Sequence, residues 1–300
     1  MTAHQPAGPS VPSPLVALST SSVYPERVRD AFRIASDLGY DAVEVMVYTD
    51  PVSQDAAAIN DLVQQHQLPV VSIHAPTLLL TQRVMHSAPW PKIDMSLDLA
   101  RAVGCDTVVV HPPFRWQRIY AREFVDGVAT REHDSGITIA VENMYPWRAG
   151  ERLVQAYLPH WDPVEQPYDN VTLDLSHAAT ALEDSLEMAQ ALGDRLHHVH
   201  LTDGLGSALD EHLVPGRGSQ PAKELLQHLA STGFAGSVVV EVSTRKVSAH
   251  QRREDLAESL AFARRHLARP EPVGGPAPDG GPGSDGGANP DGGANPDGGA

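Results

Sequence analysis

The sequence predicts a closed (β/α)8 barrel, and three observations lead to this fold class. Short β-branched runs alternate with longer amphipathic stretches through most of the chain, as in α/β proteins built on a parallel sheet. Eight such runs occur, each followed by a helical pattern or a long connection. The chain has 300 residues, and a barrel needs about 250. An open doubly wound sheet is the alternative, but no Gly-x-Gly-x-x-Gly follows the first run, so a dinucleotide-binding version has no support.

The expected elements follow from hydrophobic periodicity. Strands are predicted at 15–18, 42–47, 70–74, 107–111, 138–142, 171–175, 196–201 and 238–242. Helices are predicted at 26–38, 55–66, 93–103, 124–134, 185–192, 222–231 and 253–267. Several of these helices end at a glycine before the next strand, because glycine adopts the left-handed conformation of a helix C-cap at low cost. These glycines are Gly39, Gly104, Gly136 and Gly233.

The two ends of the chain differ from the middle in composition. From Gly286 the sequence Gly-Gly-Ala-Asn-Pro-Asp occurs twice, and no Lys or Arg follows Arg269. A segment of this kind cannot bury enough apolar area to offset its loss of conformational entropy. We therefore predict a disordered Gly/Pro/Asp-rich tail at 271–300, a flexible arm at 1–12 and a single barrel domain at 13–270.

Charge and cysteine content narrow the partners and the compartment. The formal net charge is −16, from 38 acidic and 22 basic residues, which disfavours binding to nucleic acid or to an anionic membrane. The single cysteine, Cys105, cannot form an intramolecular disulfide. The first residues carry no signal-peptide pattern, and the apolar runs are too short to span a membrane. We expect a soluble, cytoplasmic protein with a small-molecule partner.

Potential metal ligands follow the expected strands at their carboxyl ends, where barrel enzymes place their chemistry. Six of the eight strands have His, Asp or Glu as their last or last but one residue, after apolar residues: His74, His111, Glu142, Asp174, His200 and Glu241. An unpaired buried carboxylate costs several kcal/mol, and a shared cation would stabilise Glu142 and Glu241 together. Carboxylate and imidazole ligands suit Zn²⁺, Mn²⁺, Co²⁺ or Fe²⁺. His198 shares the inward face of its strand with His200, and the role of Glu44 is left open.

Five motifs in this order resemble those of the xylose-isomerase-like barrel superfamily, which contains sugar and sugar-phosphate isomerases and epimerases and the endonuclease IV family. The motifs are Ser72-Ile-His-Ala-Pro76, Val141-Glu-Asn143, Leu173-Asp-Leu-Ser-His177, His200-Leu-Thr-Asp203 and the segment Asp210-Glu-His-Leu-Val-Pro-Gly-Arg-Gly218. Each motif alone is weak, whereas their order and spacing are specific. The resemblance covers residues 14–268.

The resemblance implies a divalent-metal-dependent isomerase or epimerase. Glu142, Asp174, His200 and Glu241 match the metal ligands, for which Mn²⁺, Zn²⁺ and Co²⁺ are the candidates. Glu142 and Glu241 match the two catalytic glutamates, which move a proton on opposite faces of the substrate carbon through an enediolate-like intermediate. The positions that match substrate-binding residues are His74, His111, His177, His212 and Arg217. Arg217 could reach a hydroxyl or a phosphate, although many relatives have glutamate there.

Endonuclease IV-like hydrolysis of abasic DNA is the main alternative. That family binds three zinc ions through nine ligands, and a multi-metal site suits phosphodiester cleavage. The matching residues are His74, His111, Glu142, Asp174, His177, His200, Asp210, His212 and Glu241, all of the right type. The basic residues expected near the strand ends are Arg83, Lys92, Arg115, Arg118, Arg148, Arg152, Arg217, Arg245 and Lys246, a supply that suits a phosphosugar better than a DNA duplex.

The third hypothesis is a barrel that binds a metal or a sugar but catalyses no reaction. It is disfavoured because both glutamates are present. Barrels of this type often pair through helices or through the loops above the strands, so a homo-oligomer is compatible with the sequence.

Overall fold

The computed structural model describes residues 14–77, 81, 83–149 and 152–268. The arm predicted at 1–12 and the tail predicted at 271–300 lie outside the described residues.

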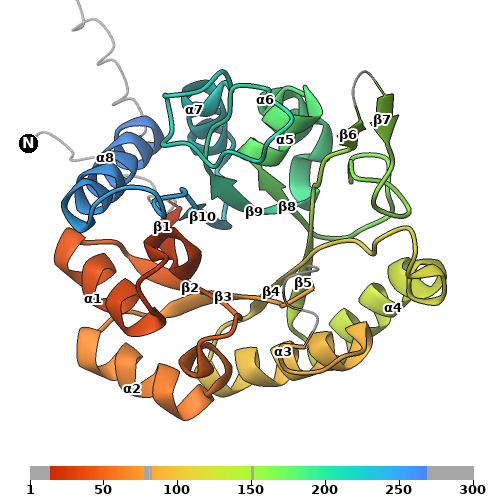
Figure 1. The fold of residues 1–300 in the computed structure, drawn as a ribbon, viewed down its shortest axis with the longest axis horizontal. Helices are drawn as coiled ribbons and strands as arrows, with labels where there is room; N and C mark the ends of the chain where they lie inside the picture. The colour runs from red at the N-terminus through yellow and green to blue at the C-terminus, as the bar shows by residue number, and fades with distance from the viewer. Residues whose placement is uncertain (1–13, 78–80, 82, 150–151, 269–300) are drawn as a thin grey trace, which may run out of the picture. The chain divides into compact units, whose positions relative to one another are not determined.

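Eight parallel strands close into a barrel, which confirms the predicted fold class (Figure 1). The strands are β1 (Leu15–Ser19), β2 (Ala42–Met46), β3 (Val70–His74), β4 (Thr107–Val110), β5 (Thr138–Glu142), β8 (Val171–Asp174), β9 (Leu196–Leu201) and β10 (Ser237–Val240). Around the ring they follow the order β1-β10-β9-β8-β5-β4-β3-β2. Closure pairs the first strand with the last in parallel register, with Leu15 opposite Ser237.

The helices lie outside the ring of strands (Figure 1). They are α1 (Val28–Leu38), α2 (Ala56–His66), α3 (Pro89–Val103), α4 (Arg118–Ser135), α5 (Leu175–Ala181), α6 (Ser185–Leu192), α7 (Ala222–Thr232) and α8 (Ala249–Leu267). The four glycines predicted as C-caps, at 39, 104, 136 and 233, all have φ between 67° and 85°. A positive φ of this size is the left-handed conformation that ends a helix.

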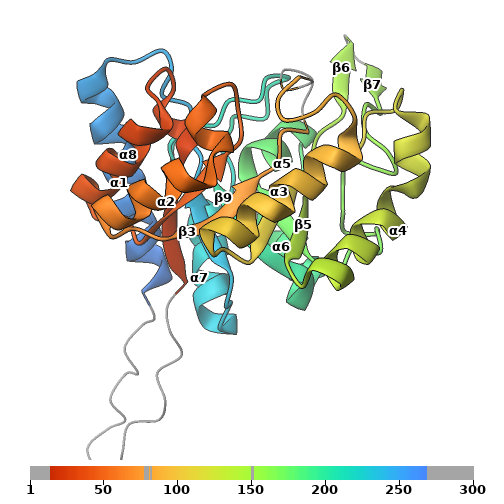
Figure 2. The same ribbon diagram turned by 90° about the horizontal axis from the view of Figure 1, so that it is seen from below.

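Several elements differ in extent from the sequence prediction: α3 begins at Pro89 and α4 at Arg118, earlier than predicted, and β10 ends at Val240, two residues before the predicted end. Two further differences lie near the expected site. The strand predicted at 171–175 ends at Asp174, because the Asp174 carboxylate accepts a hydrogen bond from the His177 amide and caps α5. The connection after β5 contains an antiparallel pair, β6 (Trp147–Ala149) and β7 (Arg152–Val154). This pair projects beyond the carboxyl ends of the barrel strands (Figure 2).

The barrel interior changes from apolar to polar toward the carboxyl ends of the strands. The small apolar residues Ala17, Ala42 and Val239 form a buried cluster separate from the main core between strands and helices. Side chains two positions apart on a strand share one face, so Glu44 lies above Ala42, and Glu241 lies above Val239. The interior therefore carries carboxylates at the end where the functional residues were expected. Among the described residues, no helix combines the length and the apolar character needed to cross a membrane.

Candidate active site

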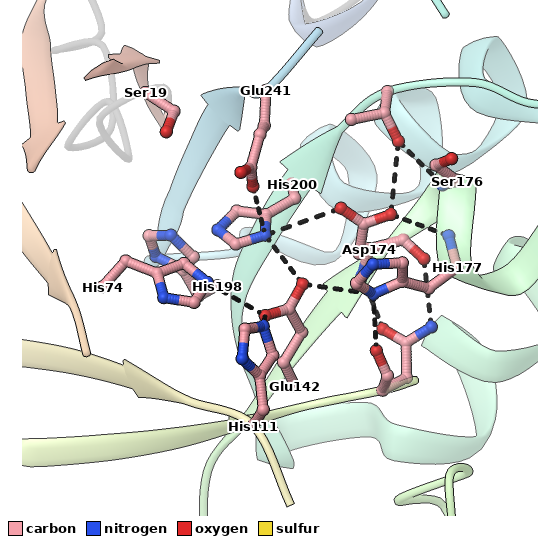
Figure 3. A network of polar contacts seen from close by, with 12 residues as sticks. Ser19, His74, His111, Glu142, Asp174, Ser176, His177, His198, His200 and Glu241 are labelled. Atoms are coloured by element: carbon pink, nitrogen blue, oxygen red, sulfur yellow. Dashed lines mark hydrogen bonds and ion pairs between the residues drawn. The ribbon is translucent and has the colours of Figure 1, made fainter. Parts of the chain in front are cut away.

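The four residues predicted as metal ligands come together around the His200 ring (Figure 3). The His200 Nδ1 atom lies 2.9 Å from Glu241 Oε2, 3.1 Å from Glu142 Oε1 and 3.6 Å from Asp174 Oδ2. Glu142 ends β5, Asp174 ends β8, His200 lies on β9, and Glu241 directly follows β10. The strands thus bring to one point residues that are up to 99 positions apart in the sequence (241 − 142 = 99).

The donor set of this cluster fits a divalent cation. The ligand atoms of Glu142, Asp174, His200 and Glu241 lie within 4.8 Å of one another, and all four residues are buried. Asp174 Oδ2 is buried and has no hydrogen-bond donor within the described part of the chain. Three carboxylates in so small a buried volume repel one another, and a cation would compensate their charge and satisfy the free oxygen.

The charges within the cluster shift its pKa values in opposite directions. Burial alone would lower the pKa of His200, but the carboxylates of Glu241, Glu44 and Glu142 raise it well above its usual value. Burial alone would raise the pKa of Glu142, but His111 and His200 hold it well below its usual range. A cation and the His200 proton would compete for the same carboxylates, so metal binding at this site would release a proton.

Three further groups of potential ligands adjoin the first and share residues with it. One of them consists of Glu44, His198 and His200. His111 Nε2 lies 2.8 Å and His74 Nε2 lies 3.1 Å from Glu142 Oε2, which forms a group on the side of β3 and β4. On the other side, Asp174 forms a group with His177 and His212. Glu142 and Asp174 therefore each belong to two groups.

Asp210 connects the two histidines of the outer group. Its Oδ2 lies 3.0 Å from His212 Nε2 and 3.3 Å from His177 Nε2. All nine residues that match the endonuclease IV ligands consequently form one continuous network.

Main-chain carbonyls fix the orientation of two of these rings. His177 Nδ1 lies 2.8 Å from Asn143 O, and His212 Nδ1 lies 2.7 Å from Glu241 O. A carbonyl oxygen only accepts, so Nδ1 of each ring donates, and the Nε2 atoms face Asp210. Asn143 holds this side of the site together, because its side chain also bonds to both the amide and the carbonyl of Asp174.

Several contact residues were not predicted from the sequence. Glu44 accepts a hydrogen bond from Ser72 Oγ at 2.8 Å and pairs with His198 Nε2 at 3.0 Å. Ser21 Oγ donates to Glu241 Oε1 at 3.0 Å. Glu44 had a recognisable signal, a carboxylate inside an apolar strand, whereas nothing in the sequence distinguishes Ser21 from its neighbours.

Arg217 is not brought to the cluster. Its Nη2 lies 2.9 Å from Asp255 Oδ1 and also contacts Glu258, both on α8. The hydrogen bond with Glu258 raises the pKa of Arg217. Arg217 does not line the cavity beside the cluster, so its position gives no support to the substrate-binding role expected for it.

A cavity of about 100 Å³ opens beside the cluster. Its walls include His74, His111, His177 and His212, the four histidines predicted to bind substrate, together with Glu142 and Glu241. Tyr145 and Tyr157 also line it. Because most of these residues are buried, a molecule held here would be largely shielded from water.

A family model described as the xylose isomerase-like TIM barrel matches residues 32–266. The chain belongs to this family. An uncharacterised protein of Mycobacterium tuberculosis is 50% identical over 278 residues, which cover 86% of this chain and 99% of that protein. The fructoselysine 3-epimerase of Escherichia coli O157:H7 is 23% identical over 239 residues, which cover 72% of this chain and 86% of that protein.

Solved structures agree with the barrel. The structure of an AP endonuclease, family 2, from Brucella melitensis superimposes with a TM-score of 0.63 at 20% identity, over 83% of this chain and 99% of that chain. At this identity the likeness concerns the fold of the xylose isomerase-like barrel and not the reaction.

Proposed function

We propose that this family member is a divalent-metal-dependent epimerase or isomerase that acts on a sugar or a sugar phosphate. The approach of Glu142 and Glu241 to one nitrogen of His200, at 3.1 Å and 2.9 Å, carries the proposal. Both carboxylates also line the cavity beside the cluster, so both are within reach of a molecule held there, as a reaction needs when it removes a proton and returns it on another face. The similarity to a fructoselysine 3-epimerase supports a sugar as the substrate.

The proposed mechanism assigns proton transfer to the two glutamates. A cation bound by Glu142, Asp174, His200 and Glu241 would stabilise the negative charge that develops on a carbonyl oxygen of the substrate. One glutamate removes the proton from the carbon next to the carbonyl, which gives an enediolate-like intermediate. The other glutamate, which starts protonated, delivers its proton to the opposite face for epimerisation. For isomerisation it delivers this proton to the neighbouring carbon, while the proton of the adjacent hydroxyl passes to the former carbonyl oxygen.

The remaining residues would bind and orient the substrate. His74, His111, His177 and His212 line the cavity, and their ring nitrogens can hydrogen-bond to sugar hydroxyls. Ser21 holds Glu241 by a hydrogen bond at 3.0 Å, which limits the rotation of this carboxylate. The aromatic rings of Tyr145 and Tyr157 contribute apolar surface that excludes water from the reacting carbon.

Hydrogen exchange with solvent tests the two-glutamate mechanism. The metal-loaded protein is incubated with a panel of ketoses and their phosphates in D₂O, and deuterium at the carbon next to the carbonyl is measured by mass spectrometry and NMR. We expect incorporation with the wild type and its loss in Glu142→Gln and Glu241→Gln. Glu187→Gln, an exposed position on α6, is the matched control and should behave as the wild type. Undiminished exchange in either active-site variant would disprove the mechanism.

A multi-metal phosphodiesterase that cleaves abasic DNA is the second candidate. The three ligand groups that share Glu142 and Asp174 favour it, because neighbouring cations can bind both the attacking and the leaving oxygen of a phosphodiester. The net charge of −16 opposes binding of a DNA duplex. The number of metal ions bound per chain separates the two candidate functions.

A further inference from the structure

A second and larger pocket lies next to the proposed active site. Its volume is about 430 Å³, and its lining includes Ser21, Tyr24, Arg27, Met46, Tyr48 and Arg245; we refer to it as the arginine pocket. The lining segments follow the carboxyl ends of β1, β2 and β10, which are neighbours in the barrel. The arginine pocket therefore opens on the same face of the barrel as the metal-ligand cluster.

Two residues connect the arginine pocket to the active site. Met46 lines both the arginine pocket and the cavity beside the cluster. Ser21 lines the arginine pocket and donates its hydroxyl to Glu241 Oε1 at 3.0 Å. A molecule whose reacting carbon lies beside Glu241 can therefore extend toward Arg27 and Arg245.

The volumes of the two spaces indicate that a substrate occupies both of them. Pockets that bind small molecules usually measure about 300–1,000 Å³. The cavity beside the cluster, at about 100 Å³, is below this range, whereas the arginine pocket, at about 430 Å³, is within it. The smaller cavity suits the reacting atoms, and the remainder of a substrate would then occupy the arginine pocket.

The charged side chains of the arginine pocket favour an anion. Both acidic residues that line it are already bonded to other groups. Glu26 Oε1 accepts from Arg252 Nη1 at 3.0 Å, and the carboxylate of Asp50 accepts from the amides of Val28 and Val52 at 3.1 and 3.2 Å.

The positive charges of the two lining arginines, in contrast, are not compensated by carboxylates of the described residues. Within the described part of the chain, neither Arg27 nor Arg245 forms an ion pair with a carboxylate, and both residues are exposed. Guanidinium groups bind phosphate and carboxylate oxygens with paired hydrogen bonds.

We propose that the arginine pocket binds an anionic group carried by the sugar at the end remote from the reacting carbon. The inference rests on the proposed function and narrows its substrate class to phosphorylated or acidic sugars. It transfers to Arg27 and Arg245 the anion-binding role that the sequence suggested for Arg217. A phosphate ester and a carboxylate share the required chemistry, and simple anions distinguish them.

Isothermal titration of the metal-loaded protein with inorganic phosphate and with acetate tests the arginine pocket without knowledge of the sugar. The wild type is compared with Arg27→Gln, Arg245→Gln and the double variant. Each single variant should bind the preferred anion about tenfold more weakly, because it loses a charge-assisted interaction. Arg29→Gln is the control, since Arg29 is exposed on α1, two residues after Arg27, but does not line the pocket, and it should match the wild type within about twofold.

The outcomes are distinct from those of the exchange experiment. Tighter binding of phosphate assigns a phosphorylated sugar, and tighter binding of acetate assigns a sugar acid. Binding that is absent, or that is unchanged in both single variants, overturns the proposal. Anion binding that depends on Arg27 and Arg245 without any hydrogen exchange would retain the pocket and reject the epimerase. Hydrogen exchange on neutral ketoses without anion binding would support the epimerase and reject the anion-binding role of the arginine pocket.

Discussion

Glu44 lies behind the His200 ring and contacts the nitrogen that the metal-ligand cluster leaves free. Glu44 Oε2 is 3.3 Å from His200 Nε2, while Nδ1 of the same ring faces Glu142, Asp174 and Glu241. A carboxylate on the second nitrogen of a metal-binding histidine fixes the orientation of the ring and its tautomer. Because a carboxylate only accepts, Nε2 carries a proton toward Glu44, and the Nδ1 lone pair can face a cation.

Replacement of Glu44 by glutamine should weaken metal binding while the barrel remains folded. The glutamine amide retains the volume of Glu44 and can turn its oxygen toward Ser72, His198 and His200, but it lacks the negative charge that acts on the His200 ring. We expect an affinity about 10–100-fold lower, measured by competition with a chelator. Ser72→Ala is the matched control, because it removes a contact of Glu44 at 2.8 Å and leaves both histidines paired. Unchanged metal affinity in a folded Glu44→Gln protein would show that Glu44 does not position His200.

Metal stoichiometry should distinguish the two candidate functions. We expect about one tightly bound divalent ion per chain by elemental analysis after dialysis, because among the described residues only one ligand group joins three carboxylates to a histidine. Asp174→Asn should remove this ion, whereas His74→Ala and His212→Ala should retain it. Two or three ions in the wild type, with the loss of one in either histidine variant, would instead support the phosphodiesterase. Cleavage of DNA that contains abasic sites would then be the activity to measure.

Asp203 should be a major determinant of stability in the loop that carries Asp210 and His212. Its buried carboxylate accepts from the amides of Gly204, Gly216, Gly218 and Gln220 at 2.8, 2.9, 3.0 and 3.1 Å. In Asp203→Asn, an amide NH₂ group would face amide donors, and we expect a loss of about 3 kcal/mol in the free energy of unfolding by urea. The control Asp126→Asn, exposed on α4, should change this quantity by less than about 0.5 kcal/mol. Equal stability of the two variants would contradict this role.

The same contact explains why the second glycine of the Pro-Gly-x-Gly motif is required. A Cβ atom at Gly218 would lie 2.2 Å from Asp203 Oδ1. Gly218→Ala should therefore displace the carboxylate and lower the melting temperature, as Asp203→Asn does. The combined variant should be less destabilised than the sum of the two single variants, because both changes break the same contact.

The sequence was sufficient for the fold and for the residue types at the strand ends, because both follow from local patterns. Glu142 ends β5 at the residue predicted, and the strand alternation that put His198 beside His200 is confirmed by their common contact with Glu44. The direction in which the Arg217 side chain points could not be predicted from local patterns. The motif fixes its backbone, but the long side chain turns to Asp255 and Glu258, acids on a helix whose proximity only the folded barrel establishes.

Cys105 should report on folding through its thiol. The side chain is buried between α3 and β4, and burial raises its pKa to about 12. At pH 8 the folded protein should not react with a thiol reagent, while in urea one thiol per chain should react.

An unfolded cysteine has a pKa of about 8.5, so the folded state keeps a proton that the unfolded state loses above that pH. The stabilisation is complete below about pH 8.5 and declines as pH rises toward 12. Wild type should therefore lose about 2 kcal/mol more than Cys105→Ala between pH 8 and pH 10 in urea unfolding, and equal losses would mean that the thiol is accessible in the folded state.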